Sequence, residues 1–482
     1  MTILPLDPAA NATPEALQAF LAGCRAAAAR DGHAKLVSIS LAVDALDPLA
    51  VLESIFEPRE LHFYAERPSL ESAIAGAEAV VSCEAHGPER FATIQRFIDE
   101  TLAHTIAVGD VNAAFGGPHF FAAFAFHNEV ECGEPFPAAR VFVPRWQVAR
   151  AGDRTTAVAN LLVTPDAPLE ALTEKVWRAH GKFRSFDYGV GDATARAPST
   201  PPKTAARRFK DKSPAGEAAR YATAVETAVY EIARGDYQKI VLARQRTVRA
   251  SEPLHPLRML NGLRQRFPDC YAFSVANGAG QSFIGATPER LVRVSKGVLE
   301  TEALAGSAPR GASASDDAMY GAALLRSEKD RREQDLVAST IRRGLESLGL
   351  TLEMPPAPVL RRLANVQHLH TPVRANLPEG VRLLDALARL HPTPAVGGAP
   401  RDVAVARIRS LEGFPRGLYA GALGWLNARG GGEFFVGLRS ALVDGATAQL
   451  FAGAGIVAGS TPASEVAETD LKFRAMLSAL EE

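Results

Sequence analysis

The spacing of apolar side chains predicts both helices and strands along this chain. Apolar residues recur at intervals of three and four positions, or helix end signals occur, in segments 13–30, 217–234, 255–266, 327–348 and 463–481. The first of these begins with Thr13 as N-cap, Pro14 in the first turn and an acidic Glu15 after it. We therefore expect helices near both ends of the chain and in its middle.

Other segments are typical of strands, and the one at 36–43 alternates in the manner of a strand with one buried face. They lie at 36–43, 60–66, 120–126, 139–148, 237–249, 271–276, 282–286 and about 291–304. Strands and helices do not alternate regularly, and no repeat recurs at a fixed period. This mixture favours an α+β fold over a doubly wound parallel sheet.

One stretch interrupts these patterns between the two halves of the chain. Four prolines stand between residues 198 and 214 among Lys, Arg, Ala and Ser, with hardly any apolar side chains. We expect an N-terminal part at 1–190, a linker or surface loop at 191–217, and a C-terminal region at 218–482.

Composition and charge exclude several classes of function. Hydrophobic residues make up 47% of the 482 residues and charged residues 22%, the balance of a globular protein with a sizeable core. Lys and Arg total 53 against 54 Asp and Glu, so the basic excess that nucleic-acid binding requires is missing. We expect no nucleic-acid partner.

The cysteines and the N-terminus indicate a reducing compartment. The four cysteines are widely separated and form no C-x-x-C pair. The start lacks the basic and apolar regions of a signal peptide, and no apolar run reaches the roughly 18–20 residues of a membrane helix. We expect a soluble cytoplasmic protein without a membrane partner.

The strand at 237–244 contains an unusual lysine. Lys239 shares a face with Tyr237, Val241 and Ala243, because side chains alternate along a strand. A lysine here either extends its amine to solvent at a sheet edge or is desolvated enough to act as a general base. The strand alone favours the first interpretation.

A carboxyl group follows the next strands, in the segment 283–290. Thr287, Pro288 and Glu289 are typical of a turn or helix start. The alternative is that Glu289 lies in a partly apolar site, keeps its proton and serves as a general acid.

Two predicted helices carry acidic residues on one face. Asp330 and Glu333 are three residues apart, and Glu465, Glu468 and Lys472 follow the same spacing on the last helix. Each acidic face alone is most often solvated. Brought together, the two faces would supply the oxygen ligands that Mg²⁺ prefers.

A glycine-rich segment at 450–459 precedes the last helix. Its G-x-G-x-x-x-G spacing and the short remaining chain exclude a dinucleotide-binding turn, so its glycines are better suited to close approach of an anion. Arg439, within a predicted strand at 434–440, either binds a carboxylate in bidentate fashion or forms a structural ion pair. His368 stands out among the histidines, although a lone histidine is usually structural.

Taken in order, these segments resemble the chorismate-binding family, which includes isochorismate, salicylate, anthranilate and aminodeoxychorismate synthases. The resemblance is dense from residue 218 onward and weaker before it. It rests on the blocks Lys239–Arg244, Gly285–Arg290, Glu302–Ser307, Ser327–Glu333, Val366–Leu369, Leu418–Trp425, Phe435–Ser440 and Gly453–Lys472. The family implies one large α+β domain of two stacked antiparallel sheets flanked by helices, with the active site between them.

The resemblance also implies a metal site and a substrate. Glu333 and Glu468 look like the principal Mg²⁺ ligands, with Asp330 and Glu465 supporting the ion through water. The metal would bind the ring carboxylate of chorismate. The other residues that resemble substrate-binding positions of the family are Gly306, Ser307, His368, Tyr419, Arg439, Gly453, Gly455 and Lys472.

The same resemblance predicts the reaction. Lys239 is similar to the base that activates water in isochorismate-forming members, and Glu289 to the acid that protonates the departing 4-hydroxyl. Ala395 stands where pyruvate-eliminating relatives usually carry threonine, which favours stopping at isochorismate. No glutamine amidotransferase segment is present, which disfavours the ammonia-using members.

Two alternatives remain beside isochorismate formation. One is a salicylate synthase, which adds pyruvate elimination, and the other is a non-catalytic chorismate-binding subunit. The N-terminal portion and the segment 143–148 resemble enzymes of menaquinone biosynthesis more than those of siderophore biosynthesis. A monomer is the family's usual state.

Overall fold

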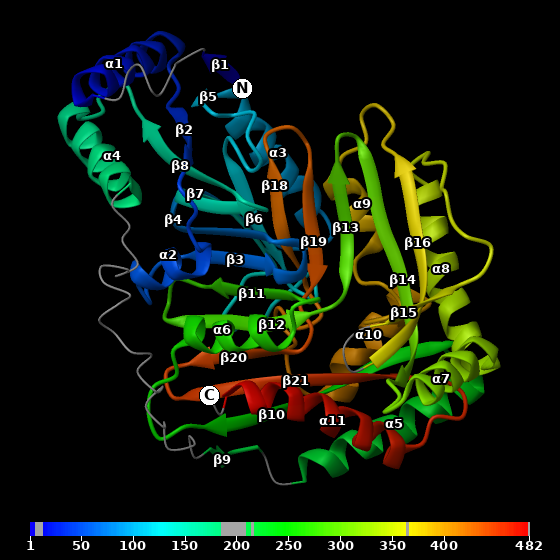
Figure 1. Cartoon of the computed structure of the whole chain (residues 1–482). Coiled ribbons are helices and arrows are strands. Elements are labelled where there is room, and N and C mark those ends of the chain that lie inside the picture. The colour runs from blue at the N-terminus through cyan, green and yellow to red at the C-terminus, as the bar shows by residue number, and fades with distance from the viewer. Residues whose placement is uncertain (5–12, 185–208, 214–215, 363–365, 481–482) are drawn as a thin grey trace.

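The computed structural model describes residues 1–4, 13–184, 209–213, 216–362 and 366–480 (Figure 1). Its helices are α1 Pro14–Asp31, α2 Pro48–Ser54, α3 Arg90–Ala103, α4 Leu169–Arg184, α5 Glu217–Arg234, α6 Pro256–Arg266, α7 Ala314–Arg326, α8 Glu328–Glu346, α9 Leu383–Leu390, α10 Arg401–Glu412 and α11 Pro462–Leu480, with a 3₁₀ turn at Pro68–Leu70. Its strands are β1 Thr2–Leu4, β2 Lys35–Val43, β3 His62–Arg67, β4 Ser72–Ala85, β5 Thr105–Gly109, β6 His119–Phe124, β7 Ala139–Ala151, β8 Arg154–Val163, β9 Lys210–Asp211, β10 Lys239–Arg249, β11 Tyr271–Ala276, β12 Gln281–Thr287, β13 Arg290–Ser295, β14 Val298–Pro309, β15 Val359–Arg362, β16 Val366–Asn376, β17 Gly398–Ala399, β18 Ala422–Asn427, β19 Gly432–Val436, β20 Ser440–Asp444 and β21 Thr447–Ile456.

The strands form one hydrogen-bonded sheet that branches at β7. One arm runs from β7 through β4, β3, β11, β12, β20 and β21 to β10. The other runs through β6, β18, β19, β13, β14 and β16 to β15. The second half of β7 also pairs with β8, which leads to β2 and β5. All these pairs are antiparallel except those of β5 with β1 and β2.

The two arms enclose an apolar core. In Figure 1 β14 and β16 run steeply, whereas β20 and β21 run nearly horizontally, so the arms cross at a large angle. Phe273 of β11 contacts Phe283 of β12 on one arm and Phe435 of β19 on the other. Burial of such large side chains from both arms is the main force that holds them together.

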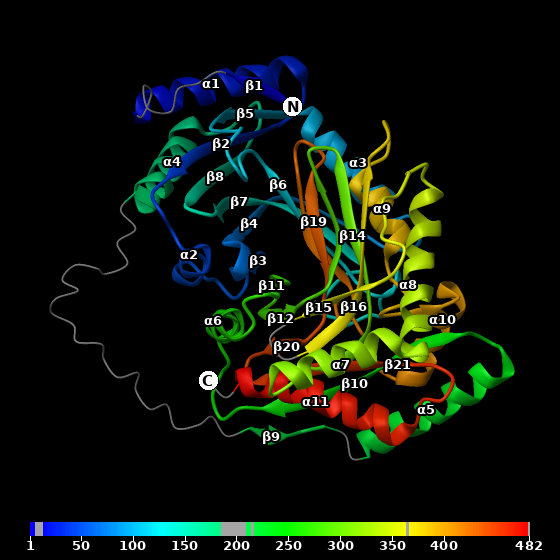
Figure 2. The same ribbon diagram turned by 45° about the vertical axis from the view of Figure 1, so that its right-hand side comes forward.

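Helices cover the outer side of the arm that ends in β10, which is the lower arm in Figure 1. Both views show α5 and α11 lying together beneath β10 and β21 (Figures 1 and 2). Arg244 of β10 fixes this packing, because its guanidinium donates to Glu217 at the start of α5 and to Asp470 of α11. Arg244 thereby fixes the position of α11 relative to β10, the strand that carries Lys239.

The predicted α+β fold is confirmed, and the two expected sheets are the two arms joined through β7. Where the sequence has clear end signals, the predicted bounds lie close to the observed ones. The helix expected at 327–348 is α8, which begins after the N-cap Ser327. Most of the expected linker at 191–217 lies outside the described residues. Within it, Lys210–Asp211 forms β9 and pairs with the end of β10.

One predicted strand is wrong at its end. Arg439 was expected within a strand at 434–440, but β19 ends at Val436 and β20 begins at Ser440. Arg439 has a φ of 47°, which no strand residue adopts, and it belongs to the connection between them. Apolar alternation cannot reveal such a left-handed residue.

Among the described residues, we find no helix that combines the length and the apolar character needed to cross a membrane.

Candidate active site

Lys239 lies at the beginning of β10 and is almost completely buried. Its side chain is 1% exposed, and its Nζ donates to Glu333 Oε1 of α8 at 2.7 Å. Glu333 is 21% exposed, so this ion pair has one buried and one accessible partner. The interpretation of Lys239 as a lysine extended to solvent is therefore wrong, because the sheet continues past it through β17 and β21.

Two glycines of β21 leave room beside this pair. A Cβ at Gly455 would lie 3.1 Å from Lys239 Cε and 3.5 Å from Glu333 Oε1. A Cβ at Gly453 would lie 2.8 Å from the hydroxyl oxygen of Tyr419. The glycine-rich strand thus allows a lysine, a carboxylate and a phenol to approach the same stretch of backbone.

Gly453 is next to groups suited to bind a carboxylate. Lys472 of α11 donates to the Gly453 carbonyl and to Glu468, both at 2.7 Å. Tyr419 is buried and stacks on Phe451, and burial raises the pKa of its hydroxyl well above the ordinary value. The phenol therefore stays protonated and remains a hydrogen-bond donor.

We expect Gly453→Ala to weaken substrate binding without unfolding the protein. The added methyl group would displace the Tyr419 hydroxyl, so the KM for the substrate should rise about tenfold, roughly 1.4 kcal/mol of binding free energy. Steady-state kinetics measure this effect. Gly23→Ala is the control, because a Cβ there meets nothing within 4 Å, and equal KM changes in both variants would contradict the prediction.

A bulge in β14 brings together the next three predicted residues. Gly306 has a φ of 68°, and the register of β14 with β16 shifts between Ala305 and Ser307. Ser307 then lies opposite His368, and Ser307 Oγ is 2.8 Å from His368 Nδ1. A Cβ at Gly306 would lie 3.1 Å from the carboxylate oxygen of Asp330, so α8 packs directly on the bulge.

His368 is a neutral imidazole at pH 7. Burial, together with the positive charges of Arg439, Arg361 and Lys472, lowers its pKa to about 4. Its Nδ1 also lies 3.2 Å from the Gly306 carbonyl, which can only accept, so a proton on Nδ1 satisfies this contact. Nε2 is buried and has no partner among the described residues, which leaves it free to accept a substrate hydroxyl proton.

Glu289 lies in the turn between β12 and β13. Burial raises its pKa to about 7, and the negative charge of Glu302 adds to this effect, whereas Lys239, Arg361 and Lys472 oppose it. A large fraction of Glu289 is therefore protonated at neutral pH, as a general acid requires. The turn interpretation of 287–289 holds for the backbone, and the carboxyl group has the properties of an acid.

Sequence reasoning did not identify the group that surrounds Glu302. Its carboxylate accepts from Arg361 Nη1 at 2.6 Å and contacts His370 Nε2 at 2.7 Å. Burial alone would raise the pKa of Glu302, but these two partners lower it to about 2. Glu302 thus stays charged next to Glu289. The sequence block 302–307 contains Glu302, but no role was predicted for it.

The four predicted metal ligands lie on two helices that meet at this end of the sheet. Asp330 and Glu333 belong to α8, and Glu465 and Glu468 belong to α11. Burial raises the pKa of Glu465, a hydrogen bond from Ser460 lowers it, and the charge of Glu468 raises it again. In the described part of the chain no three acidic, His or Cys groups are clustered closely enough to hold a metal, and Glu333 and Glu468 are each bonded to a lysine.

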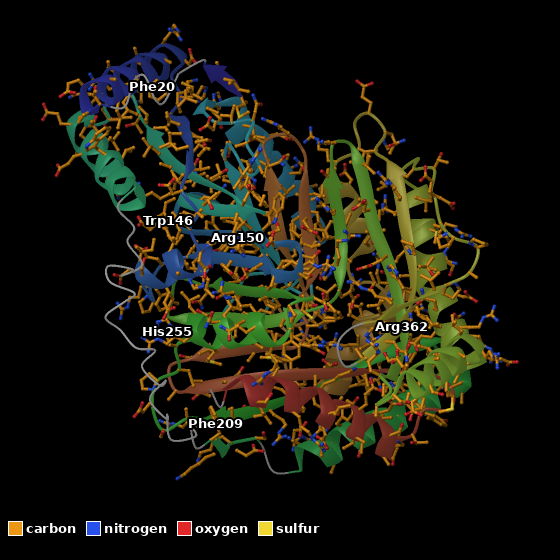
Figure 3. All side chains as sticks on the ribbon, in the orientation of Figure 1. Phe20, Trp146, Arg150, Phe209, His255 and Arg362 are labelled. Carbon is orange, nitrogen blue, oxygen red and sulfur yellow. The ribbon has the colours of Figure 1, made fainter. Side chains whose placement is uncertain are left out.

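Ala395 and Arg439 lie outside the strands, on connecting segments. Ala395 lies on the partly buried segment before β17, which pairs with β10 at Lys239. Arg439 lies near enough for its charge to lower the pKa of His368. Figure 3 shows side chains filling the region between the two arms. It labels Arg362 at the end of β15.

Comparison with known proteins gives matches along nearly the whole chain. The model of a family described as chorismate binding enzymes matches residues 19–481. The isochorismate synthase of salicylate biosynthesis from Pseudomonas aeruginosa is 37% identical over 448 residues, which cover 92% of this chain and 90% of that protein. The isochorismate synthase MenF of Bacillus subtilis is 33% identical and covers 93% and 94%.

Solved structures agree with these sequence matches. The structure of MenF, the menaquinone-specific isochorismate synthase of Escherichia coli, has a TM-score of 0.75 at 26% identity, covering 95% of this chain and 99% of that one. A 2,3-dihydroxybenzoate-specific isochorismate synthase, DhbC, from Bacillus anthracis has a TM-score of 0.67 at 25% identity, with 90% and 99% covered.

Proposed function

The chain belongs to the family of chorismate-binding enzymes, and we infer from this that it is an isochorismate synthase. The reaction adds water at C2 of chorismate and removes the hydroxyl at C4, with a shift of the ring double bonds. The observation that carries the proposal is the buried Lys239, bonded to Glu333 and near a Glu289 that is partly protonated at neutral pH.

Lys239 serves as the base in this proposal. Its amine, in the neutral form, accepts a proton from the water that forms the new C2–O bond. The bond from the Lys239 amine to the Glu333 carboxylate holds the amine at the site.

Glu289 serves as the acid. It donates its proton to the 4-hydroxyl as the C4–O bond breaks, so that one water enters and one water leaves. His368 Nε2 accepts a hydrogen bond from that hydroxyl beforehand and orients it. Burial and the charge of Glu302 together favour the protonated form of Glu289 before the C4–O bond breaks.

Magnesium is the proposed cofactor. Glu333 and Glu468 would be its principal ligands, with Asp330 and Glu465 supporting the ion through water. Carboxylate oxygens are the ligands that a hard cation such as Mg²⁺ prefers. When bound, Mg²⁺ supplies positive charge that fixes and polarises the ring carboxylate.

The enolpyruvyl carboxylate has its own cationic and polar partners. Lys472, the Tyr419 hydroxyl and Arg439 are proposed to bind it beside Gly453 and Gly455. Gly306 and Ser307 line the ring. This arrangement keeps the two carboxylates of chorismate at separate places, which fixes the ring relative to Lys239.

Isochorismate is the proposed end product, and menaquinone biosynthesis the proposed pathway. Ala395 lacks the hydroxyl that pyruvate-eliminating relatives usually carry. The similarity to the two MenF enzymes spans more than 90% of this chain, which supports the menaquinone assignment. The similarity to the Pseudomonas enzyme of salicylate biosynthesis makes a siderophore-type pathway the second candidate.

Product analysis tests the proposal directly. Purified protein is incubated with chorismate and Mg²⁺, without ammonia, and products are separated by HPLC with a chelated sample as control. Isochorismate without pyruvate, lost on chelation, is the expected result. Salicylate with pyruvate would overturn the product assignment, and no turnover would favour a non-catalytic subunit.

We expect Glu468→Gln to raise the magnesium requirement. The amide keeps the size of the side chain but removes the charge that binds the ion. The Mg²⁺ concentration that gives half-maximal activity should therefore rise at least roughly tenfold. Activity is measured against Mg²⁺ concentration. Glu328→Gln on the solvent side of α8, where Glu328 is 84% exposed, should leave that requirement unchanged. An unaltered curve for Glu468→Gln would place the ligand elsewhere.

A further inference from the structure

Within the described residues, strand β10 has no strand partner along the middle of one edge. On that side β17 pairs with Lys239 and Ile240, and β9 pairs only with Val248 and Arg249. Between these pairs two side chains satisfy the backbone: Glu412 Oε1 accepts from the Ala243 N–H at 2.6 Å, and Arg416 Nη2 donates to the Val241 carbonyl at 2.7 Å. Arg416 and Glu412 therefore replace a missing strand.

These two side chains form a fully buried ion pair. Arg416 Nη2 lies 2.5 Å from Glu412 Oε1, and Nε lies 2.9 Å from Oε2, a bidentate arrangement. Their side chains are 0% and 1% exposed, and the guanidinium lies 4.1 Å from the centre of the Phe126 ring. Every polar atom of the pair is bonded and an aromatic ring packs against it. These contacts hold the pair in a single geometry.

The same guanidinium reaches the segment that carries Ala395. Arg416 Nη1 donates to the Val396 carbonyl at 3.0 Å, and the Val241 N–H donates to the Gly397 carbonyl at 2.9 Å. One side chain is thus bonded both to the strand of Lys239, two residues beyond it, and to the backbone next to Ala395.

We propose that Arg416 and Glu412 are positioning residues that hold the amine of Lys239 and the Ala395 segment at a fixed distance from each other. The proposal rests on the role of Lys239 as the base. Proton abstraction requires the water between the amine and C2 to be aligned closely, and displacement by about 1 Å can cost roughly a hundredfold in rate. The proposed metal ligands lie on α8 and α11, so the Mg²⁺ requirement does not depend on this ion pair, whereas Tyr419 contacts it directly, with the Arg416 guanidinium carbon 5.7 Å from the centre of the Tyr419 ring.

The test uses Arg416→Lys, Glu412→Gln and the double variant of the full chain. We expect kcat per folded molecule to fall roughly ten- to a hundredfold. The Mg²⁺ requirement should stay within about twofold, the KM for chorismate should change less than kcat because only Tyr419 among the proposed carboxylate partners contacts the pair, and the double variant should lose no more than the worse single variant. The folded fraction is measured by near-UV circular dichroism and the Tm by thermal melting. Glu412→Gln keeps an acceptor for the Ala243 N–H, so it decides the proposal where Arg416→Lys does not fold.

Arg264→Lys is the matched control for a purely structural effect. Arg264 also makes a bidentate bond to a carboxylate, Asp47, but between α6 and α2, away from the site. It should lower the Tm and leave kcat unchanged. Unchanged kcat in the Arg416 and Glu412 variants would overturn the proposal, as would a rise of the Mg²⁺ requirement as large as the fall in kcat.

Lys239→Ala, assayed in parallel, separates the two hypotheses. Retained turnover in Lys239→Ala would reject the base itself. An inactive Lys239→Ala beside fully active Arg416 and Glu412 variants would reject only the positioning role.

Discussion

Replacement of Lys239 by alanine should abolish conversion of chorismate while the protein remains folded. A general base contributes roughly a hundred- to ten-thousandfold to rate, and no other amine in the described structure is bonded to Glu333. Chorismate consumption measures the loss, and equilibrium dialysis with chorismate and Mg²⁺ shows whether binding is kept. We expect binding to be retained, because removal of the amine leaves the Glu333 carboxylate free for the metal.

Lys35→Ala is the control for this substitution. Lys35 is also buried on a strand and bonded to a carboxylate, with its Nζ 2.6 Å from Asp31, but it lies on β2, remote from the site. Its replacement should reduce stability alone. Substantial turnover by Lys239→Ala would show that another group removes the proton from water.

Replacement of Glu289 by glutamine should have the second-largest effect and should change the pH dependence. The pKa of Glu289 is about 7 against an ordinary 4.5, because of burial and the charge of Glu302. The acid form is therefore abundant below pH 7 and is lost as pH rises through about 7, so this residue limits activity on the alkaline side. Glutamine cannot donate an acidic proton, so kcat should fall roughly a hundred- to ten-thousandfold.

The pH profile of the remaining activity is the decisive measurement. In Glu289→Gln the decline near pH 7 should disappear, whereas it should persist in Glu134→Gln, which alters another buried carboxyl of raised pKa away from the site. A profile that keeps its decline in Glu289→Gln would assign that titration to a different group.

Local patterns in the sequence were enough to predict much of the fold. The helix α8 could be bounded because Ser327 caps it and its apolar residues keep one face, and β10 was recognised as a strand from its apolar run at 240–243. The α+β class followed from the irregular mixture of such segments. The branch of the sheet at β7 could not be predicted, because pairing between strands distant in sequence leaves no local pattern.

The site was predicted in part for the same reason. The strand pattern singled out Lys239, but its burial depends on Glu333, which lies 94 positions away in the chain. Glu412 and Arg416 have the four-residue spacing of an ordinary solvated pair on a helix, and only the incomplete edge of β10 makes them a buried pair. The fold placed Glu302 beside Glu289, and no sequence spacing indicated it.

The branched sheet has a consequence for synthesis of the protein on the ribosome. The edges of β3 and β6 are completed by β11 and β18, which are translated much later. A nascent chain that has emerged only as far as α4 exposes both edges, and exposed edges readily pair with other chains. We therefore expect a fragment ending after α4 to aggregate, and the last half of the chain to act as the partner that keeps the first half soluble.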